Sequence, residues 1–180
     1  MIFSLIGLCA LFSLLCAFLF YHIKAVILRR PPFVTTKQEG VNLAIAALNL
    51  DNGSVLYDLG CGDGRILETA MKQTNCSKGV GIEVNIIAST IARFRTRNMN
   101  VKILSMDFNK VNLQEATHIY MYLLPATILE LERKILSECR GGTIIVSYDF
   151  ALSNLKLVRT IHVPGPTFGS HRLYVYKVIG

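Results

Sequence analysis

The segment that most constrains the fold is VLYDLGCGDGR at residues 55–65, where Gly60, Gly62 and Gly64 directly follow an apolar strand pattern. Glycine lacks a Cβ and adopts positive φ, so a turn of this kind lets the backbone approach a ligand closely. A helical pattern begins near Arg65, and the N–H groups of a helix N-terminus point toward whatever lies beyond such a turn. We therefore predict a strand, a ligand-binding turn and a helix in succession. A tight structural turn is the alternative interpretation.

Strand and helix patterns alternate on both sides of this turn. Thr36 is the predicted N-cap of the first helix, in a capping box with Glu39. Alternation predicts a mostly parallel sheet with helices on both faces, and the last two strands, joined by a short connection, must pair antiparallel. The predicted strands are 54–59, 79–84, 101–105, 117–123, 143–147, 156–163 and 171–178, and the predicted helices are 37–50, 65–74, 85–96 and 125–139.

An uncharged apolar run precedes this pattern. Residues 2–21 contain no charged residue, Pro or amide, and an α-helix needs about 20 apolar residues to cross a bilayer core. A cleaved signal peptide, the alternative, would have a basic region before a shorter run and small residues at a cleavage site. We predict a transmembrane anchor at 1–23, a basic juxtamembrane linker at 24–36 and a folded domain at 37–180. The predicted fold class is α/β, a Rossmann-like doubly wound seven-strand sheet, mostly parallel with an antiparallel last strand, preceded by one transmembrane helix.

Basic residues after the apolar run predict the orientation of the chain. Lys24, Arg29 and Arg30 follow it, and the positive-inside rule then places the domain on the cytoplasmic side of a bacterial inner membrane or an equivalent organelle membrane. The stretch from Arg30 to Thr36 reaches at most ~20 Å. The domain is therefore expected to stay near the bilayer, with membrane lipid as one partner and a protein of the same membrane as another.

Composition narrows the remaining classes of partner. With those three basic residues set aside, 16 Lys and Arg stand against 12 acids, a modest excess that makes nucleic acid an unlikely partner. The five Cys contain no CxxC pair and the four His have no ligand spacing, so we expect a reducing compartment and no metal. The oligomeric state is left undetermined.

The spacing of the glycine turn separates classes of cofactor. A dinucleotide fingerprint needs Gly at position 65, where Arg stands, and no Gly-Lys-Ser/Thr of a P-loop is present. The Asp-x-Gly-x-Gly-x-Gly pattern, starting at Asp58, resembles motif I of the class I, seven-strand S-adenosylmethionine-dependent methyltransferases. The resemblance implies that S-adenosyl-L-methionine is the cofactor, that Glu83 holds its ribose hydroxyls and that Asp107 and Phe108 meet its adenine; a turn cap is the alternative for Asp107. The cofactor-binding residues that it implies are Asp58, Gly60, Cys61, Gly62, Glu83, Asp107 and Phe108.

The layout of the chain resembles a narrower group. An apolar N-terminus, the segment Pro32-Phe33-Val34, DLGCGDGR and then GIEVN are similar to the membrane-anchored protein-lysine methyltransferases of ATP synthase c-subunit and adenine nucleotide translocase and their bacterial relatives. This resemblance implies a protein-lysine N-methyltransferase. Methylation of a phospholipid headgroup or of RNA is one alternative, and a non-catalytic cofactor-binding membrane protein is another.

Catalytic residues are not determined by these patterns. A lysine amine has a pKa of ~10.4 and must lose a proton before it can accept a methyl group. Candidates near the ends of the fourth and fifth strands are Tyr120, Tyr122, Tyr148 and Asp149. The alternative for each tyrosine is a packed aromatic side chain, and for Asp149 a turn cap.

Overall fold

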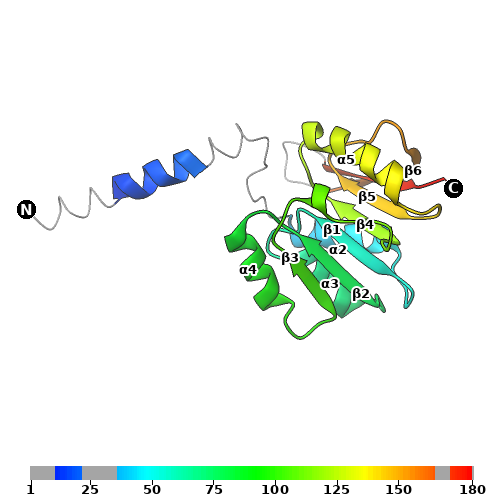
Figure 1. The fold of residues 1–180 in the computed structure, drawn as a ribbon, viewed down its shortest axis with the longest axis horizontal. Helices are drawn as coiled ribbons and strands as arrows, with labels where there is room; N and C mark the ends of the chain where they lie inside the picture. The colour runs from blue at the N-terminus through cyan, green and yellow to red at the C-terminus, as the bar shows by residue number, and fades with distance from the viewer. Residues whose placement is uncertain (1–10, 22–35, 165–170, 180) are drawn as a thin grey trace, which may run out of the picture. The chain divides into compact units, whose positions relative to one another are not determined.

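The structure, a computed structural model, describes residues 11–21, 36–164 and 171–179. The chain divides into two compact units, Met1–Pro32 and Phe33–Gly180. The second unit contains all of the strands that the structure describes (Figure 1).

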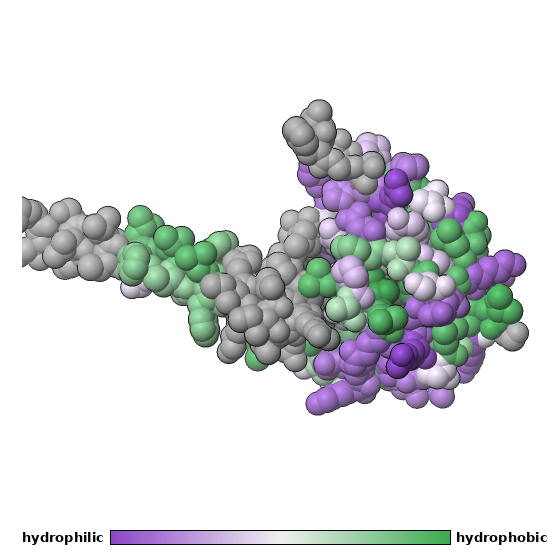
Figure 2. All heavy atoms as spheres, turned by 90° about the horizontal axis from the view of Figure 1, so that it is seen from above, coloured by the Kyte–Doolittle hydropathy of each residue, from purple (hydrophilic) through white to green (hydrophobic). Residues whose placement is uncertain are grey.

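Residues 11–21 of the first unit are helical, and every one of them is exposed. Its exposed side chains include Leu11, Phe12 and Phe18, and Figure 2 shows this helix as an apolar surface. Within the described residues, no helix has both the length and the apolar character required to span a bilayer. The predicted anchor and linker extend through 1–10 and 22–35, which lie outside the described residues.

The second unit is built on one seven-stranded sheet in the order β3-β2-β1-β4-β5-β7-β6 (Figure 1). Strands β1 to β5 are parallel, whereas β7 is antiparallel to both β5 and β6. The predicted seven-strand sheet with an antiparallel end is therefore confirmed. The strand order reverses between β1 and β4, and in such sheets ligands bind at the carboxyl ends of the strands around that point. The strands are β1 (Val55–Leu59), β2 (Lys78–Ile82), β3 (Val101–Leu104), β4 (His118–Met121), β5 (Ile144–Tyr148), β6 (Lys156–Val163) and β7 (His171–Lys177).

Helices cover both faces of the sheet and create two cores. Along β1, Leu56 packs with the helices of one face, whereas Tyr57 and Leu59 pack on the other. Because side chains alternate along a strand, Asp58 lies on the same side as Leu56. The first face carries α2 (Gln38–Leu48), α3 (Arg65–Gln73) and α4 (Ile86–Arg95), the second carries α5 (Pro125–Glu138), and the 3-10 helix η1 (Phe108–Lys110) follows β3.

Local sequence signals account for the start of α4 but not for that of α2. The side chain of Asn85 caps α4, because it accepts hydrogen bonds from the N–H groups of Ile87 and Ala88 at 2.9 and 3.2 Å. The predicted capping box of α2 is wrong: the helix begins after Lys37, which provides no side-chain cap. Thr36 instead packs over Gly40, where a Cβ would lie 3.0 Å from its Cγ2. The Thr36 side chain therefore contacts the first turn of its own helix instead of capping it.

Candidate functional site

The glycine turn joins β1 to α3 at the carboxyl edge of the sheet. Gly60, Gly62 and Gly64 have φ values of 84°, 53° and 80°, which glycine adopts without strain. The N–H groups of Gly60 and Cys61 donate to the carbonyl of Ile82 at 2.8 and 3.0 Å. These bonds hold the turn against the end of β2.

Glu83 connects this turn to the strand ends beside it. Its Oε2 accepts from the N–H of Gly62 at 3.1 Å, and its Oε1 accepts from the N–H of Asn85 at 2.7 Å. Its own N–H donates to the carbonyl of Leu104 at the end of β3, at 3.0 Å. The Glu83 carboxylate therefore lies beside the turn and also orients it.

Asp58 is buried with part of its hydrogen-bonding capacity unused. The residue is 1% exposed, and its Oδ2 has no hydrogen-bond partner among the described residues. Burial, followed by the charges of Glu83 and Asp63, raises the pKa of Asp58 well above its ordinary value of 3.8. A positively charged ligand would satisfy the unused acceptor and offset the repulsion between the acids. The site is therefore suited to a cation.

Tyr120 lies next to Asp58, because the two residues are paired across β4 and β1. Its buried hydroxyl is near the side chain of Thr36 but does not meet hydrogen-bond geometry with it. Burial, followed by the charge of Asp58, raises the pKa of Tyr120 well above 10.0. The structure thus places Tyr120 in the interior beside Asp58, where the side chain is almost completely shielded from solvent.

Three further residues of the predicted cofactor set lie at the same edge in different settings. The Cys61 side chain is buried against Gly81, where a Cβ would lie 2.7 Å from its sulfur, and burial raises the pKa of this thiol. The Asp107 carboxylate accepts from the N–H of Asn109 at 2.9 Å and caps η1, which was the alternative interpretation for this residue. Phe108 packs against the core on the α5 side.

A second group of side chains lies at the ends of β4 and β5. The ring centroids of Tyr122 and Tyr148 are 4.7 Å apart, with the planes tilted by 45°. Burial, followed by the charge of Asp149, raises the pKa of Tyr122 to about 12. Asp149 directly follows β5 and has a φ of 64°. Three of the four predicted catalytic candidates therefore come together.

His171 completes this group, and sequence reasoning missed it. Its Nδ1 lies 2.8 and 3.0 Å from the carboxylate oxygens of Asp149, and its ring centroid lies 5.5 Å from that of Tyr148. Such a bond orients the imidazole and leaves Nε2 as the nitrogen that can exchange a proton. The signal that could have found His171 is the antiparallel register between β5 and β7, which pairs Tyr148 with Leu173 and so brings the start of β7 beside Asp149.

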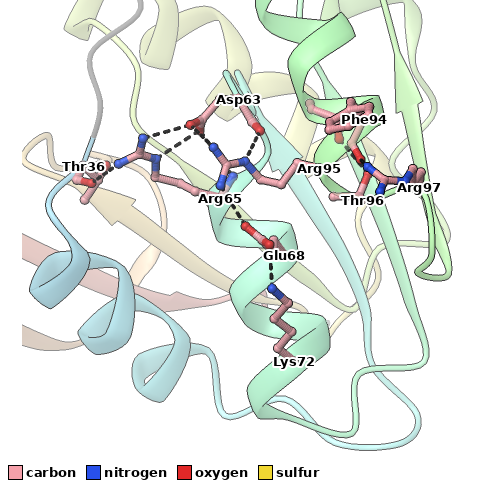
Figure 3. A network of polar contacts seen from close by, with 10 residues as sticks. Thr36, Asp63, Arg65, Glu68, Lys72, Phe94, Arg95, Thr96 and Arg97 are labelled. Atoms are coloured by element: carbon pink, nitrogen blue, oxygen red, sulfur yellow. Dashed lines mark hydrogen bonds and ion pairs between the residues drawn. The ribbon is translucent and has the colours of Figure 1, made fainter.

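Asp63, inside the glycine turn, anchors a network of ion pairs (Figure 3). Its Oδ2 lies 2.8 Å from Nη2 of both Arg65 and Arg95. Arg65 also donates to the carbonyl of Thr36 at 2.8 Å, and Arg95 pairs with Glu68 at 2.9 Å. Burial alone would raise the pKa of Asp63, but the hydrogen bond and charge of Arg65 and the charge of Arg95 lower it. The network ties the turn to α3, to α4 and to the chain that enters α2.

Among residues 11–21, 36–164 and 171–179, no three His, Cys, Asp or Glu side chains gather in a way that could hold a metal ion.

Comparison with known proteins identifies sequence relatives that share one activity. A protein-lysine N-methyltransferase of Saccharolobus islandicus is 33% identical over 151 residues, which cover 82% of this chain and 93% of that protein. An adenine nucleotide translocase lysine N-methyltransferase of Mus musculus is 28% identical, covering 83% of this chain and 64% of the relative. An ATP synthase c-subunit lysine N-methyltransferase of Homo sapiens is 28% identical, covering 66% of this chain and 52% of the relative. The chain thus spans about half to two thirds of the two mammalian relatives.

A solved structure and a family model identify the same broad class of enzyme, the methyltransferases. The crystal structure of an RNA methyltransferase from Salinibacter ruber, in complex with S-adenosyl-L-homocysteine, superposes with a TM-score of 0.74 at 29% identity, covering 81% of this chain and 94% of that one. The model of the ANTKMT methyltransferase domain matches residues 58–159, from the buried acid of the glycine turn into β6. The chain therefore belongs to the ANTKMT methyltransferase domain family and is an S-adenosylmethionine-dependent methyltransferase.

Proposed function

We propose that this chain is a membrane-anchored enzyme that methylates a lysine side chain of a protein. The observation that carries the lysine acceptor is the 33% identity with the Saccharolobus islandicus protein-lysine N-methyltransferase, across 93% of that protein. The group at the ends of β4 and β5 supports the same acceptor, because it combines aromatic rings with a proton-accepting pair.

The residues at the sheet edge fit S-adenosylmethionine. The buried Oδ2 of Asp58 offers an unused acceptor to a positively charged group, and the cofactor carries a sulfonium and an ammonium. In this proposal Glu83 would hold the ribose hydroxyls, and Asp107 and Phe108 would hold the adenine. When bound, the cofactor supplies an electrophilic methyl group, and the protein supplies orientation and a dry site.

The acceptor side must remove a proton, because a lysine amine with a pKa of ~10.4 is protonated at neutral pH. In the proposed mechanism, Nε2 of His171 takes that proton and Asp149 stabilises the resulting imidazolium. The neutral amine would then be able to accept the methyl group that the cofactor supplies. The rings of Tyr122 and Tyr148 border the path of the cationic side chain, an arrangement that aromatic faces favour.

Anchoring and location belong to the same proposal. Residues 2–21 are apolar and uncharged, and the helical residues 11–21 expose all their side chains. Lys24, Arg29 and Arg30 then favour a cytoplasmic domain. With a short stretch between Arg30 and Thr36, the acceptor is proposed to be a protein of the same membrane.

RNA is the second candidate acceptor, favoured by the Salinibacter ruber structure. The basic residues that could bind RNA are Arg93, Arg95 and Arg97 on and just after α4. Arg95, however, is engaged with Asp63 and Glu68 in the ion-pair network. Two exposed arginines are a small footprint for a phosphate backbone.

Transfer of a labelled methyl group tests the proposal. The full chain is incubated in membranes of its host with S-adenosylmethionine labelled in the methyl group, and protein, lipid and RNA are then separated. We expect label in protein, on lysine by mass spectrometry, and much less label with the Glu83→Ala variant at a limiting concentration of cofactor. Label in RNA or lipid, and none on lysine, would show that the acceptor is RNA or lipid and would refute the lysine proposal. If the chain binds the cofactor but transfers no label to any fraction, the protein is non-catalytic.

A further inference from the structure

Helix α4 turns an apolar face outward. Ile86, Ile87 and Phe94 are 72%, 74% and 68% exposed, and Ile91 is also exposed. At about 100° per residue these four side chains fall within an arc of about 140° on one side of the helix. The opposite side is buried through small residues such as Ala88 and Ala92. The helix therefore has an apolar side where the surface helix of a globular protein is normally polar.

Two cations border this apolar arc. Arg93 and Arg97 are exposed and lie along one edge of it, and the guanidinium of Arg97 sits 4.1 Å from the centroid of the Phe94 ring. Residues 84–106 contain three Arg and one Lys and no Asp or Glu. The α4 surface, defined as Ile86, Ile87, Ile91, Phe94, Arg93 and Arg97, is therefore apolar and positively charged at once.

The α4 surface begins at the edge of the cofactor site. Val84, which is exposed, directly follows Glu83, and Met106, also exposed, directly precedes Asp107. Apolar side chains thus adjoin both acids at the carboxyl ends of β2 and β3. A partner that covers α4 would lie next to the side of the sheet where the cofactor is proposed to bind.

We propose that the α4 surface rests on the anionic face of a lipid bilayer. Isoleucine side chains insert among acyl chains, and a border of arginine attracts anionic headgroups. The exposed cations of this surface, Arg93 and Arg97, complement such a charge. Four of the exposed apolar side chains named above are aliphatic and branched, whereas RNA is bound largely by aromatic stacking, and Phe94 is the single aromatic among them. The bilayer is therefore the occupant that this chemistry favours.

This inference extends the membrane association of the proposed function and is independent of the lysine acceptor. It adds a second contact with lipid, made by the folded unit itself, that holds the carboxyl edge of the sheet at headgroup level. A methyl acceptor close to the membrane surface would then lie within reach of the site.

Tryptophan fluorescence tests the contact directly, because the chain contains no Trp. The Phe94→Trp variant of the full chain is compared with Leu129→Trp, which places the probe at a 58% exposed position of α5 on the other face of the sheet. Both are mixed with vesicles of phosphatidylcholine and phosphatidylglycerol that contain brominated lipid. We expect a shift to shorter wavelength and quenching for Phe94→Trp alone. Vesicle-bound protein with neither probe quenched, or with both quenched equally, would overturn the inference and leave anchoring by the N-terminus intact.

A fragment that lacks residues 1–32 tests the α4 contact without the N-terminal segment. Residues 33–180 form a compact unit with both cores, so this fragment is used on its own. We expect it to bind anionic vesicles more tightly than neutral ones, and Ile87→Glu to lower binding by about tenfold. Unchanged cofactor binding by Ile87→Glu controls for folding. Three results would contradict the proposal. The fragment does not bind vesicles, the Trp probe shifts with RNA instead of lipid, or the protein dimerises through α4 without lipid.

Discussion

Asp58 and His171 are two ionisable residues with opposite environments. Asp58 is almost completely buried beside two other acids, and this burial keeps it protonated at pH values where a free carboxyl is ionised. His171 has a side chain that is 46% exposed, and its partner is the carboxylate of Asp149. The buried acid is suited to binding a cation, and the exposed imidazole is suited to exchanging a proton. Each role leads to a measurable pH effect.

Cofactor binding is expected to release a proton from Asp58. A cation beside the carboxyl favours its ionised form, so the pKa of Asp58 falls on binding. Affinity then rises with pH until the carboxyl of the free protein is itself ionised. Calorimetry in two buffers of different ionisation enthalpy, below about pH 7 so that the ligand's α-amino group stays protonated, measures this release. The Asp58→Asn variant should bind more weakly and release no proton. Equal heats in both buffers for the unmodified chain would refute the expectation.

Replacing Glu83 should weaken cofactor binding by about 10- to 100-fold, since hydrogen bonds to a charged group contribute about 1.5–3 kcal/mol. Glu83→Ala removes the acceptor proposed for ribose and also the bond that orients Gly62. Glu130→Ala is the control, because Glu130 is an exposed acid on α5 that bonds to Asn109. Similar affinities for the two variants would remove Glu83 from the cofactor site.

His171→Gln is expected to lower turnover on a lysine substrate by about 10²-fold while cofactor affinity stays the same. The loss should shrink as pH rises toward about 10, because the substrate amine then loses its proton to solvent. Rates measured against pH for both proteins provide the test. A deficit that is constant across pH would indicate a structural role for His171.

At the scale of elements, the glycine turn depends on contacts from segments far apart in the chain. Asp63 holds Arg65 from the start of α3 and Arg95 from the end of α4, and Arg65 reaches the carbonyl of Thr36 before α2 (Figure 3). Because the pKa of Asp63 is lowered, this network stabilises the fold above pH 3.8 and loses its contribution as pH falls through the lowered value. The shape of the cofactor turn is thereby linked to the packing of three helices.

Arg95→Met should lower the free energy of unfolding by about 1–3 kcal/mol, because it leaves a largely buried carboxylate with one partner fewer. It should also weaken cofactor binding, since Asp63 lies within the turn. Urea unfolding at neutral pH measures the first effect, and below pH 3.8 the difference from the unmodified chain should narrow. Arg97→Met, which removes an exposed arginine from the same segment, is the matched control. Equal stability of the two variants would show that the network contributes little.

At the scale of the whole molecule, the chain joins an apolar N-terminal segment to a unit that contains its own sheet and cores. The unit Phe33–Gly180 holds both core clusters and all the candidate site residues. The residues proposed for catalysis and the segment proposed for anchoring therefore belong to separate units of the chain. A short tether would raise the local concentration of acceptors in the same membrane without altering the site.

If the proposed membrane protein is the substrate, removal of residues 1–32 is expected to leave cofactor affinity unchanged and to slow methylation of that target. A soluble peptide with the same target lysine should be methylated equally fast by both forms. Initial rates at equal enzyme concentration measure the difference. Equal rates on the membrane target would mean that the N-terminal segment has no part in reaching it.

The sequence by itself determined the order of elements, the seven-strand sheet with its antiparallel end, and the position of the glycine turn. These follow from local properties: apolar periodicity, turn residues and the backbone freedom of glycine. A local signal failed at Thr36, where the predicted cap is replaced by packing over Gly40. The place of Glu83 in the site was implied by the resemblance to the methyltransferase family, and the structure adds its hydrogen bond from the N–H of Gly62.

The tertiary structure alone decided which side chains meet. His171 joins Asp149 across 22 positions of the chain, Arg95 reaches Asp63 across 32, and Oδ2 of Asp58 is left without a partner among the described residues. Strand register and helix packing set these distances, and neither can be calculated from the residues at one position. Burial acts in the same way, because the pKa of Asp58 depends on what surrounds it and not on its neighbours in sequence.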